Sequence, residues 1–166
     1  MVITLNIHHL FKYPVETVLK TYLNKHESSD SNVEKVETIS SSQEDEMTCL
    51  KRRKTLSNYF PHFFRRLEIL KRDTVTVEEE IWTQPSARRY WIRSKDTTWE
   101  NAVIAHLVYL SEYEENPKWS LWEQDTVVDL SSFGVFGVVL ELYLKRQLNT
   151  GMKNELRSLE KLAYYQ

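Results

Sequence analysis

The densest charge in this 166-residue sequence is a basic run, Lys-Arg-Arg-Lys, at positions 51–54. Neighbouring side chains in a strand point to opposite faces, so Lys51 and Arg53 share one face and Arg52 and Lys54 share the other. Two of these side chains could therefore line one pocket, where guanidinium and ammonium groups bind phosphate or carboxylate. The alternative is a solvated edge strand protected by its charge, and this holds for at least two of the four.

The other residues with reactive side chains do not form a pattern for catalysis. The carboxylate run 78–80 alternates in a strand, so only its first and third members could act together, and such runs are typical of a solvated sheet face. His8 and His9 point to opposite faces and cannot share a metal ion. His106 lies in an apolar strand, where a hydrogen-bonded core histidine is the usual outcome. The sequence has no nucleophile elbow, phosphate loop or His-Glu-x-x-His pattern, so we expect neither enzymatic activity nor a metal or other cofactor.

The composition favours a packed globule without a charged field. Hydrophobic residues make up 41% of the chain and aromatic residues 12%. The formal net charge of −2 gives no whole-molecule attraction for nucleic acid or for an anionic membrane, so any anion site must be local. Cys49 is the only cysteine, which excludes an intramolecular disulfide and a thiolate zinc site. No run of about 18 apolar residues is present, and the alternation over residues 2–7 predicts a strand rather than a cleavable targeting signal.

The elements that position these residues follow from periodicity. A period of two predicts a first strand over residues 3–7, and Pro14 is placed to begin a helix with one apolar face. A long amphipathic helix is predicted beyond Gly134, where the period changes to 3.6. Six further strands are predicted between these helices, at residues 33–40, 47–55, 74–82, 88–94, 101–111 and 121–130. We therefore expect one α+β domain over residues 1–166: a curved antiparallel sheet of about seven strands with a short N-terminal helix, closed by the long C-terminal helix over an apolar cavity.

Several segments, taken in order, resemble one known family. They are HHLFKYP at residues 8–14, NYFP at 58–61, EIWTQP at 80–85, ENPKW at 115–119, and Leu-Glu at 140–141. In order and spacing, over almost the whole chain, these segments are similar to PRELI/MSF1 domains.

The resemblance implies a fold, an activity and partners. The family domain is a curved seven-stranded antiparallel sheet with helices over a lipid cavity. Its characterised members carry phosphatidic acid or phosphatidylserine across the mitochondrial intermembrane space. They do so as heterodimers with a small helical protein that carries twin cysteine pairs. We therefore expect transfer of an anionic phospholipid, transient contact with membrane surfaces, this small partner, a mitochondrial intermembrane-space location, and no nucleic-acid binding.

The resemblance also implies residues that bind the lipid headgroup. Lys25 matches the position of a basic headgroup-binding residue, although a cation that stabilises a helix C-terminus is the alternative. Arg52 matches a basic position of the family and is expected as a pocket or structural cation, and Lys54 shares its face. The family's stretch after Lys25 is replaced here by His-Glu-Ser-Ser at residues 26–29, which brings a carboxylate close to the headgroup position.

The aromatic segment after residue 57 lies where the family has its lid. Four aromatic residues fall within residues 59–64, next to arginines. Rings beside guanidinium groups suit the interface of a bilayer. We expect the lid and membrane contact to be formed by Tyr59, Phe60, Phe63, Phe64 and Arg65. The alternative is a short helix whose phenylalanines pack on the sheet.

The long C-terminal helix is expected to roof the cavity through Leu144, Leu148, Gly151 and Met152. Gly151 stands where phosphatidic-acid carriers have an asparagine, and it could bend the helix or let it approach the sheet closely. This departure, with the one at residues 26–29, leaves open an interaction module of the same fold without transfer activity. A separate alternative is a carrier of another hydrophobic small molecule, or an enzyme, on a similar curved sheet.

Overall fold

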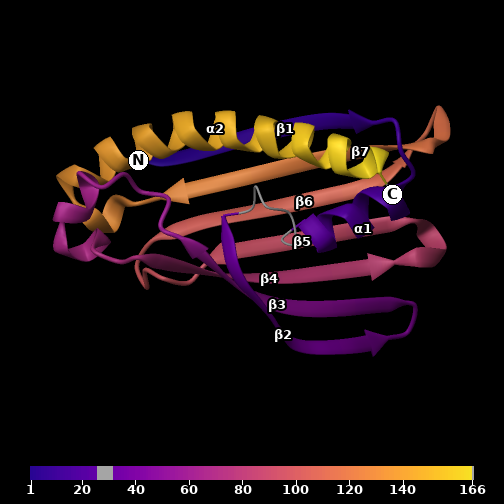
Figure 1. Ribbon diagram of the computed structural model, residues 1–166, viewed down its shortest axis with the longest axis horizontal. Helices are drawn as coiled ribbons and strands as arrows, with labels where there is room; N and C mark the ends of the chain where they lie inside the picture. The colour runs from indigo at the N-terminus through magenta and orange to yellow at the C-terminus, as the bar shows by residue number, and fades with distance from the viewer. Residues whose placement is uncertain (26–31, 166) are drawn as a thin grey trace.

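A computed structural model of the chain, which describes residues 1–25 and 32–165, contains one seven-stranded antiparallel sheet (Figure 1). The strand order is β1-β7-β6-β5-β4-β3-β2. The strands are β1 (Val2–Phe11), β2 (Val33–Glu44), β3 (Met47–Ser57), β4 (Thr74–Gln84), β5 (Arg89–Asp96), β6 (Val103–Tyr113) and β7 (Asn116–Asp129). The α+β class and the antiparallel sheet predicted from the sequence are confirmed.

Strands β2 to β7 form a meander in which each strand pairs with the next, and β1 returns to pair with β7. The sequence places these strands correctly but makes several of them too short. The sequence predicts one strand that ends at residue 40 and a next one that begins at residue 47, yet β2 continues to Glu44 and the turn is made by Asp45 and Glu46 alone. Asp45 has a φ of 51°, a left-handed conformation that aspartate tolerates in tight turns.

Two helices pack on the same face of this sheet. Helix α1 (Val15–Asn24) begins directly after Pro14 and buries Val15, Val18 and Leu19. Helix α2 (Val135–Tyr164) lies over the sheet and runs alongside β1 and β7 (Figure 1). Its buried stripe repeats every three or four residues, which is the pattern that predicted the helix; the stripe includes Leu140, Leu144, Met152, Leu156, Leu159 and Ala163.

The core consists of two clusters of buried residues. The first joins α1, the middle of the sheet and the end of α2 around Phe11, Val18 and Trp122. The second joins the other end of the sheet to the start of α2 around Phe60 and Leu140. The sheet and α2 are thus held together at both ends, which leaves the region between the clusters for a cavity.

The turn into α2 depends on close backbone contact at Gly137. A Cβ atom at this position would lie 2.1 Å from the carbonyl oxygen of Leu130, so no other residue fits without a shift. The buried Glu141 carboxylate also accepts the backbone N–H of Leu130, at 2.9 Å. The prediction of a close approach at Gly151 is wrong, because a Cβ atom there would meet nothing within 4 Å, and α2 continues through this position.

Candidate functional site

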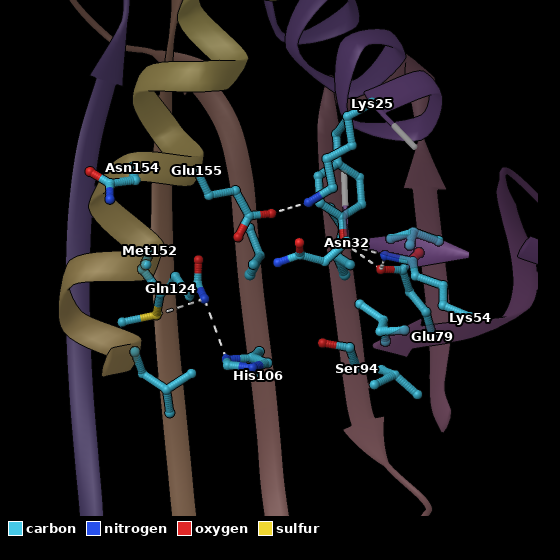
Figure 2. A pocket seen from close by; sticks show the side chains of 18 of the residues that line it. Lys25, Asn32, Lys54, Glu79, Ser94, His106, Gln124, Met152, Asn154 and Glu155 are labelled. Carbon is cyan, nitrogen blue, oxygen red and sulfur yellow. Dashed lines mark hydrogen bonds and ion pairs between the residues drawn. The ribbon is translucent and has the colours of Figure 1, made fainter. Parts of the chain in front are cut away.

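A cavity of about 720 Å³ lies between the sheet and α2. This volume is within the range of roughly 300–1,000 Å³ that small-molecule sites occupy. Its walls are largely apolar and include Leu56, Val77, Ile92, Ile104, Leu148 and Leu162. Polar side chains line it from several elements: charged groups come from β3, β4, β5, α2 and the residue after α1, and Ser94, His106 and Gln124 come from β5, β6 and β7 (Figure 2).

Glu79 forms the centre of a buried ion cluster on the cavity wall. Its side chain is only 1% exposed. The carboxylate accepts hydrogen bonds from Nε of Arg52 at 3.0 Å, from Nζ of Lys54 at 2.7 Å, and from the hydroxyl of Tyr22. Burial alone would raise the pKa of Glu79, but Lys54 and Arg52 outweigh burial and hold the pKa at about 2. The carboxylate is therefore charged and fully partnered.

Strand register explains this cluster. Arg52 lies opposite Glu79 in the β3–β4 pair, so both side chains point to the helix-covered face. Lys51 and Arg53 point to the other face, where they pair with Glu80 and Glu78 in solvent. The predicted alternation of the basic run is confirmed.

The prediction that the carboxylate run is a solvated face is wrong for its central member. Glu79 has the same parity as the apolar residues Val75, Val77 and Ile81, and this signal in the sequence could have identified it as inward-facing. Burial without partners would be costly for a carboxylate, so its two cations are needed for the fold.

Arg52 connects β3 to both β4 and α1. Besides its bonds to Glu79, its Nη1 donates to the carbonyl oxygen of Leu23 at 3.1 Å, which ties the end of α1 to β3. Its side chain is buried behind the cavity wall, whereas Lys54 lines the cavity. Of the two interpretations given for Arg52, the structure favours the structural cation.

Lys25 and Glu155 form a second ion pair at the mouth of the cavity, where both side chains are partly exposed. Lys25 comes directly after α1, Glu155 projects from α2, and the two side chains point toward each other (Figure 2). The Lys25 ammonium also lies over the ring of Tyr22, 4.4 Å from its centroid. Burial would raise the pKa of Glu155, but the Lys25 ammonium outweighs burial and lowers it. Unlike Glu79, both partners keep access to solvent, with side chains 21% and 41% exposed.

His106, Gln124 and Met152 add neutral polar groups to the cavity wall. Nδ1 of His106 lies 2.7 Å from the hydroxyl of Thr126, and Nε2 of Gln124 donates to Sδ of Met152 at 3.1 Å. Burial lowers the pKa of His106, which favours the neutral imidazole. This histidine is hydrogen-bonded as expected, but it lines the cavity rather than the core. The sequence analysis did not identify Gln124, Asn32 or Glu155 as lining residues.

All four expected roof residues line the cavity. Leu144 and Met152 are buried, Leu148 is half-buried, and Gly151 lies at the rim. Because nothing lies within 4 Å of a Cβ atom at Gly151, this glycine leaves open space at the cavity edge.

The aromatic segment between β3 and β4 is anchored at its start. Asn58 is buried, and its Nδ2 donates to the carbonyl oxygens of Leu70 and Arg72 at 3.2 and 2.7 Å. Nε and Nη2 of Arg65 donate to the carbonyl oxygens of Phe60 and Asn58 at 3.0 and 2.7 Å, so two of its three nitrogen atoms are bonded inside the segment. Phe60 is 1% exposed and belongs to the core. The prediction that Phe60 contacts a membrane is therefore wrong. Its ring packs in the core, in agreement with the alternative in which phenylalanines of this segment pack on the sheet.

The other aromatic residues of the segment differ in exposure. The Tyr59 hydroxyl donates to Asp96 at 2.5 Å although part of its ring is exposed, and Phe64 packs on Tyr143 of α2 with ring centroids 5.3 Å apart. Phe63 is 61% exposed. The segment forms two short 3₁₀ turns, η2 (Phe64–Arg66) and η3 (Glu68–Leu70), beside the start of α2 (Figure 1).

Exposed apolar side chains gather where these turns meet α2. We define the apolar end as Phe63, Ile69, Val135, Phe136, Val139 and Leu142, each at least half exposed. Arg66, Lys71 and Arg72 are exposed in the same segment. Exposed apolar groups that cluster in this way usually mark a surface that contacts a membrane or another molecule.

Two other kinds of functional element are absent from the described residues. Within residues 1–25 and 32–165, no group of three or more His, Cys, Asp or Glu side chains is arranged to hold a metal ion. No helix in the described part of the chain is both long enough and apolar enough to cross a membrane.

Comparison with known proteins gives one family and several similar folds. The model of the PRELI-like family matches residues 16–164. The protein TTHA0849 from Thermus thermophilus is similar in structure, with a TM-score of 0.64 and 14% identity over 98% of each chain. The Zhui aromatase/cyclase from Streptomyces sp. R1128 has a TM-score of 0.60 and 11% identity over 99% of this chain and 94% of its own. The 18 kDa protein CC1736 from Caulobacter crescentus has a TM-score of 0.55 and 8% identity over 97% and 95%. At these identities the solved structures establish the fold alone.

Proposed function

Because this chain belongs to the PRELI-like family, we propose that it binds a phospholipid in its cavity and carries it between membranes. The observation that carries the proposal is a cavity of about 720 Å³ whose walls are largely apolar but include several charged and polar side chains. Such a cavity suits an amphiphile, whose acyl chains need an apolar environment and whose headgroup needs charged partners. The cargo expected from the family resemblance is anionic, phosphatidic acid or phosphatidylserine.

The charged groups divide between holding the fold and meeting the lipid. Arg52 and Glu79 are saturated and buried, so they stabilise the wall. Lys54 lines the cavity beside them, and Lys25 is reached from its mouth. The headgroup phosphate is proposed to bind these two ammonium groups, since charge-assisted hydrogen bonds are strong in a partly buried site. This role requires no covalent chemistry and no cofactor.

The apolar end is the proposed site of transient membrane contact. Phe63 and Phe136 would enter the headgroup region, and the neighbouring basic side chains would meet lipid phosphates. Of the residues expected to form the lid, this proposal retains Phe63 as a membrane contact. It also adds the exposed apolar residues at the start of α2. Tyr59 and Phe64 would support the segment from behind, through Asp96 and Tyr143.

The remaining features of the proposal rest on the family resemblance. We propose a small helical partner with twin cysteine pairs and a location in the mitochondrial intermembrane space. Within the family, we propose that this chain is similar to PRELI domain-containing protein 2. Co-purification of a tagged chain from mitochondrial fractions tests the partner and the location together.

The decisive experiment extracts lipid from the purified protein for mass spectrometry and measures transfer between liposomes. The variant Leu148→Trp, which fills the cavity, should lose both bound lipid and transfer. The control Asn149→Trp places the same ring on an exposed neighbouring position and should keep both. A chain that is empty and moves no lipid even with its partner would refute the proposal in favour of the interaction module. A bound compound that is not a phospholipid would favour the other carrier.

A further inference from the structure

We propose that the Lys25–Glu155 pair selects a headgroup carrying both a phosphodiester and an ammonium group, as in phosphatidylserine, with Glu155 binding the ammonium. This inference rests on the proposed function and concerns which phospholipid is carried. It assigns to Glu155 a specificity role that the basic residues of the site cannot supply.

The first step is that the two ion clusters differ in how readily a ligand can enter them. Glu79 is fully buried and accepts from Arg52, Lys54 and Tyr22, so a ligand would have to replace three donors to reach it. Lys25 and Glu155 are partly exposed at the cavity mouth and face each other. In the part of the chain that the structure describes, the Lys25–Glu155 pair is therefore the ion pair of the cavity that a headgroup can open.

The second step is what happens to Glu155 when a phosphate binds. A phosphate that takes the Lys25 ammonium displaces the Glu155 carboxylate from it. This carboxylate projects from α2 into a cavity with apolar walls, close to Leu159 and Leu162. An unpartnered, partly buried carboxylate is costly, and it would also repel the incoming phosphate. An ammonium group on the same headgroup removes both costs, because it replaces Lys25 as the partner of Glu155.

The third step is the balance of charge around the cavity. The lining cations are Lys25 and Lys54, with Arg52 behind the wall. The lining carboxylates are Glu79, Asp96 and Glu155. Asp96 is itself held by the hydroxyl of Tyr59 and the backbone N–H of Thr98, at 2.5 and 2.7 Å. The described cavity wall thus carries no surplus of positive charge, so a headgroup with only negative charge, such as phosphatidic acid, is poorly matched.

Phosphatidylserine and phosphatidylglycerol provide the matched test, because both carry one net negative charge and only the former has an ammonium. Transfer of these two lipids and of phosphatidic acid is measured between liposomes, for the full chain with its partner. The unmodified chain should move phosphatidylserine about tenfold faster than phosphatidylglycerol, as expected for one hydrogen-bonded charge pair. The variant Glu155→Gln, which keeps the shape of the side chain, should reduce this preference to about twofold or less.

Glu160→Gln is the control variant. Glu160 lies one turn further along α2, has a similar exposure and pairs with His9 at 2.9 Å, but it does not line the cavity. This variant should keep the preference for phosphatidylserine. Equal transfer of all three lipids by the unmodified chain, or an unchanged preference in Glu155→Gln, would overturn this inference while leaving the carrier function intact. A chain that binds and moves none of them would instead refute the proposed function itself.

Discussion

Replacing Glu79 by glutamine tests whether the buried ion cluster stabilises the fold. The change removes one negative charge and leaves Arg52 and Lys54 facing each other in a site where Glu79 is 1% exposed. Glutamine has almost the same size, so packing is preserved and the effect is electrostatic. The protein should remain folded but become markedly less stable.

Two estimates of the loss in the free energy of unfolding agree, one from buried ion pairs in general and one from the pKa of Glu79. Removing one partner of a buried ion pair costs roughly 3–5 kcal/mol. Independently, the pKa of Glu79 is about 2 instead of its ordinary 4.5. At about 1.4 kcal/mol for each pKa unit, this difference corresponds to about 3 kcal/mol of stabilisation of the charged form. We therefore expect the free energy of unfolding to fall by about 3 kcal/mol or somewhat more.

Glu78→Gln is the matched control on the same strand. Glu78 pairs with Arg53 at 3.1 Å, but both side chains are nearly half exposed. Such surface pairs contribute about 0–1 kcal/mol, so this variant should change stability little. Both free energies are obtained from urea unfolding followed by tryptophan fluorescence. Equal effects of the two substitutions would refute the reasoning, as would a loss at Glu79 below about 1 kcal/mol.

A double variant extends the test in case Glu79→Gln does not fold. Adding Lys54→Met removes one of the two cations left without a partner and replaces it with an apolar side chain of similar length. The double variant should then recover part of the lost stability, because its site contains one uncompensated charge instead of two. No recovery would mean that the cost arises from lost hydrogen-bond geometry rather than from charge.

Other parts of the fold give three further predictions. Gly137→Ala should lower the free energy of unfolding by about 1–3 kcal/mol or more, because its Cβ atom would collide with a backbone carbonyl; Gly151→Ala should instead raise it by up to about 1 kcal/mol, since the space there is open and alanine favours helix. Urea midpoints separate the two, and equal losses would contradict this account. Stability should fall as the pH is lowered from 4.5 toward about 2, because the depressed pKa of Glu79 means that the unfolded chain takes up a proton first; the fall should be smaller in Glu79→Gln. Phe136→Asp should weaken liposome binding about tenfold or more, from the apolar burial lost, whereas Leu107→Asp, at an exposed site on β6, should not; flotation assays measure both.

Local sequence patterns were sufficient to predict the strands and helices of the fold. Alternation placed the strands, and the 3.6-residue period placed α2, because both depend on which side of one element is apolar. Alternation also separated Arg52 and Lys54 from their neighbours correctly. The same rule applied to residues 78–80 turns Glu79 inward, whereas the charge of the run alone predicts a solvated face.

The site depends on contacts that no local pattern contains. Lys25 and Glu155 are separated by 130 residues, and their pairing follows from how α1 and α2 pack on the sheet. The aromatic segment between β3 and β4 shows the same limit at short range. Phe60 and Phe63 are only three residues apart and equally apolar, yet the hydrogen bonds of Asn58 and Arg65 turn one inward and leave the other in solvent.

Tyr22 links the stable ion cluster to the pair at the cavity mouth. Its hydroxyl donates to Glu79, and its ring lies under both the Lys25 ammonium, at 4.4 Å, and the Lys54 ammonium, at 5.1 Å. The proposed carrier function requires that the lipid is bound firmly and released again, so the groups that meet the headgroup have to change partners while the wall behind them stays in place. A saturated cluster around Glu79 provides that fixed wall, and it holds the aromatic ring against which Lys25 rests. Lys25 can then exchange Glu155 for a phosphate without losing its position, because its contact with the ring does not depend on which anion it binds.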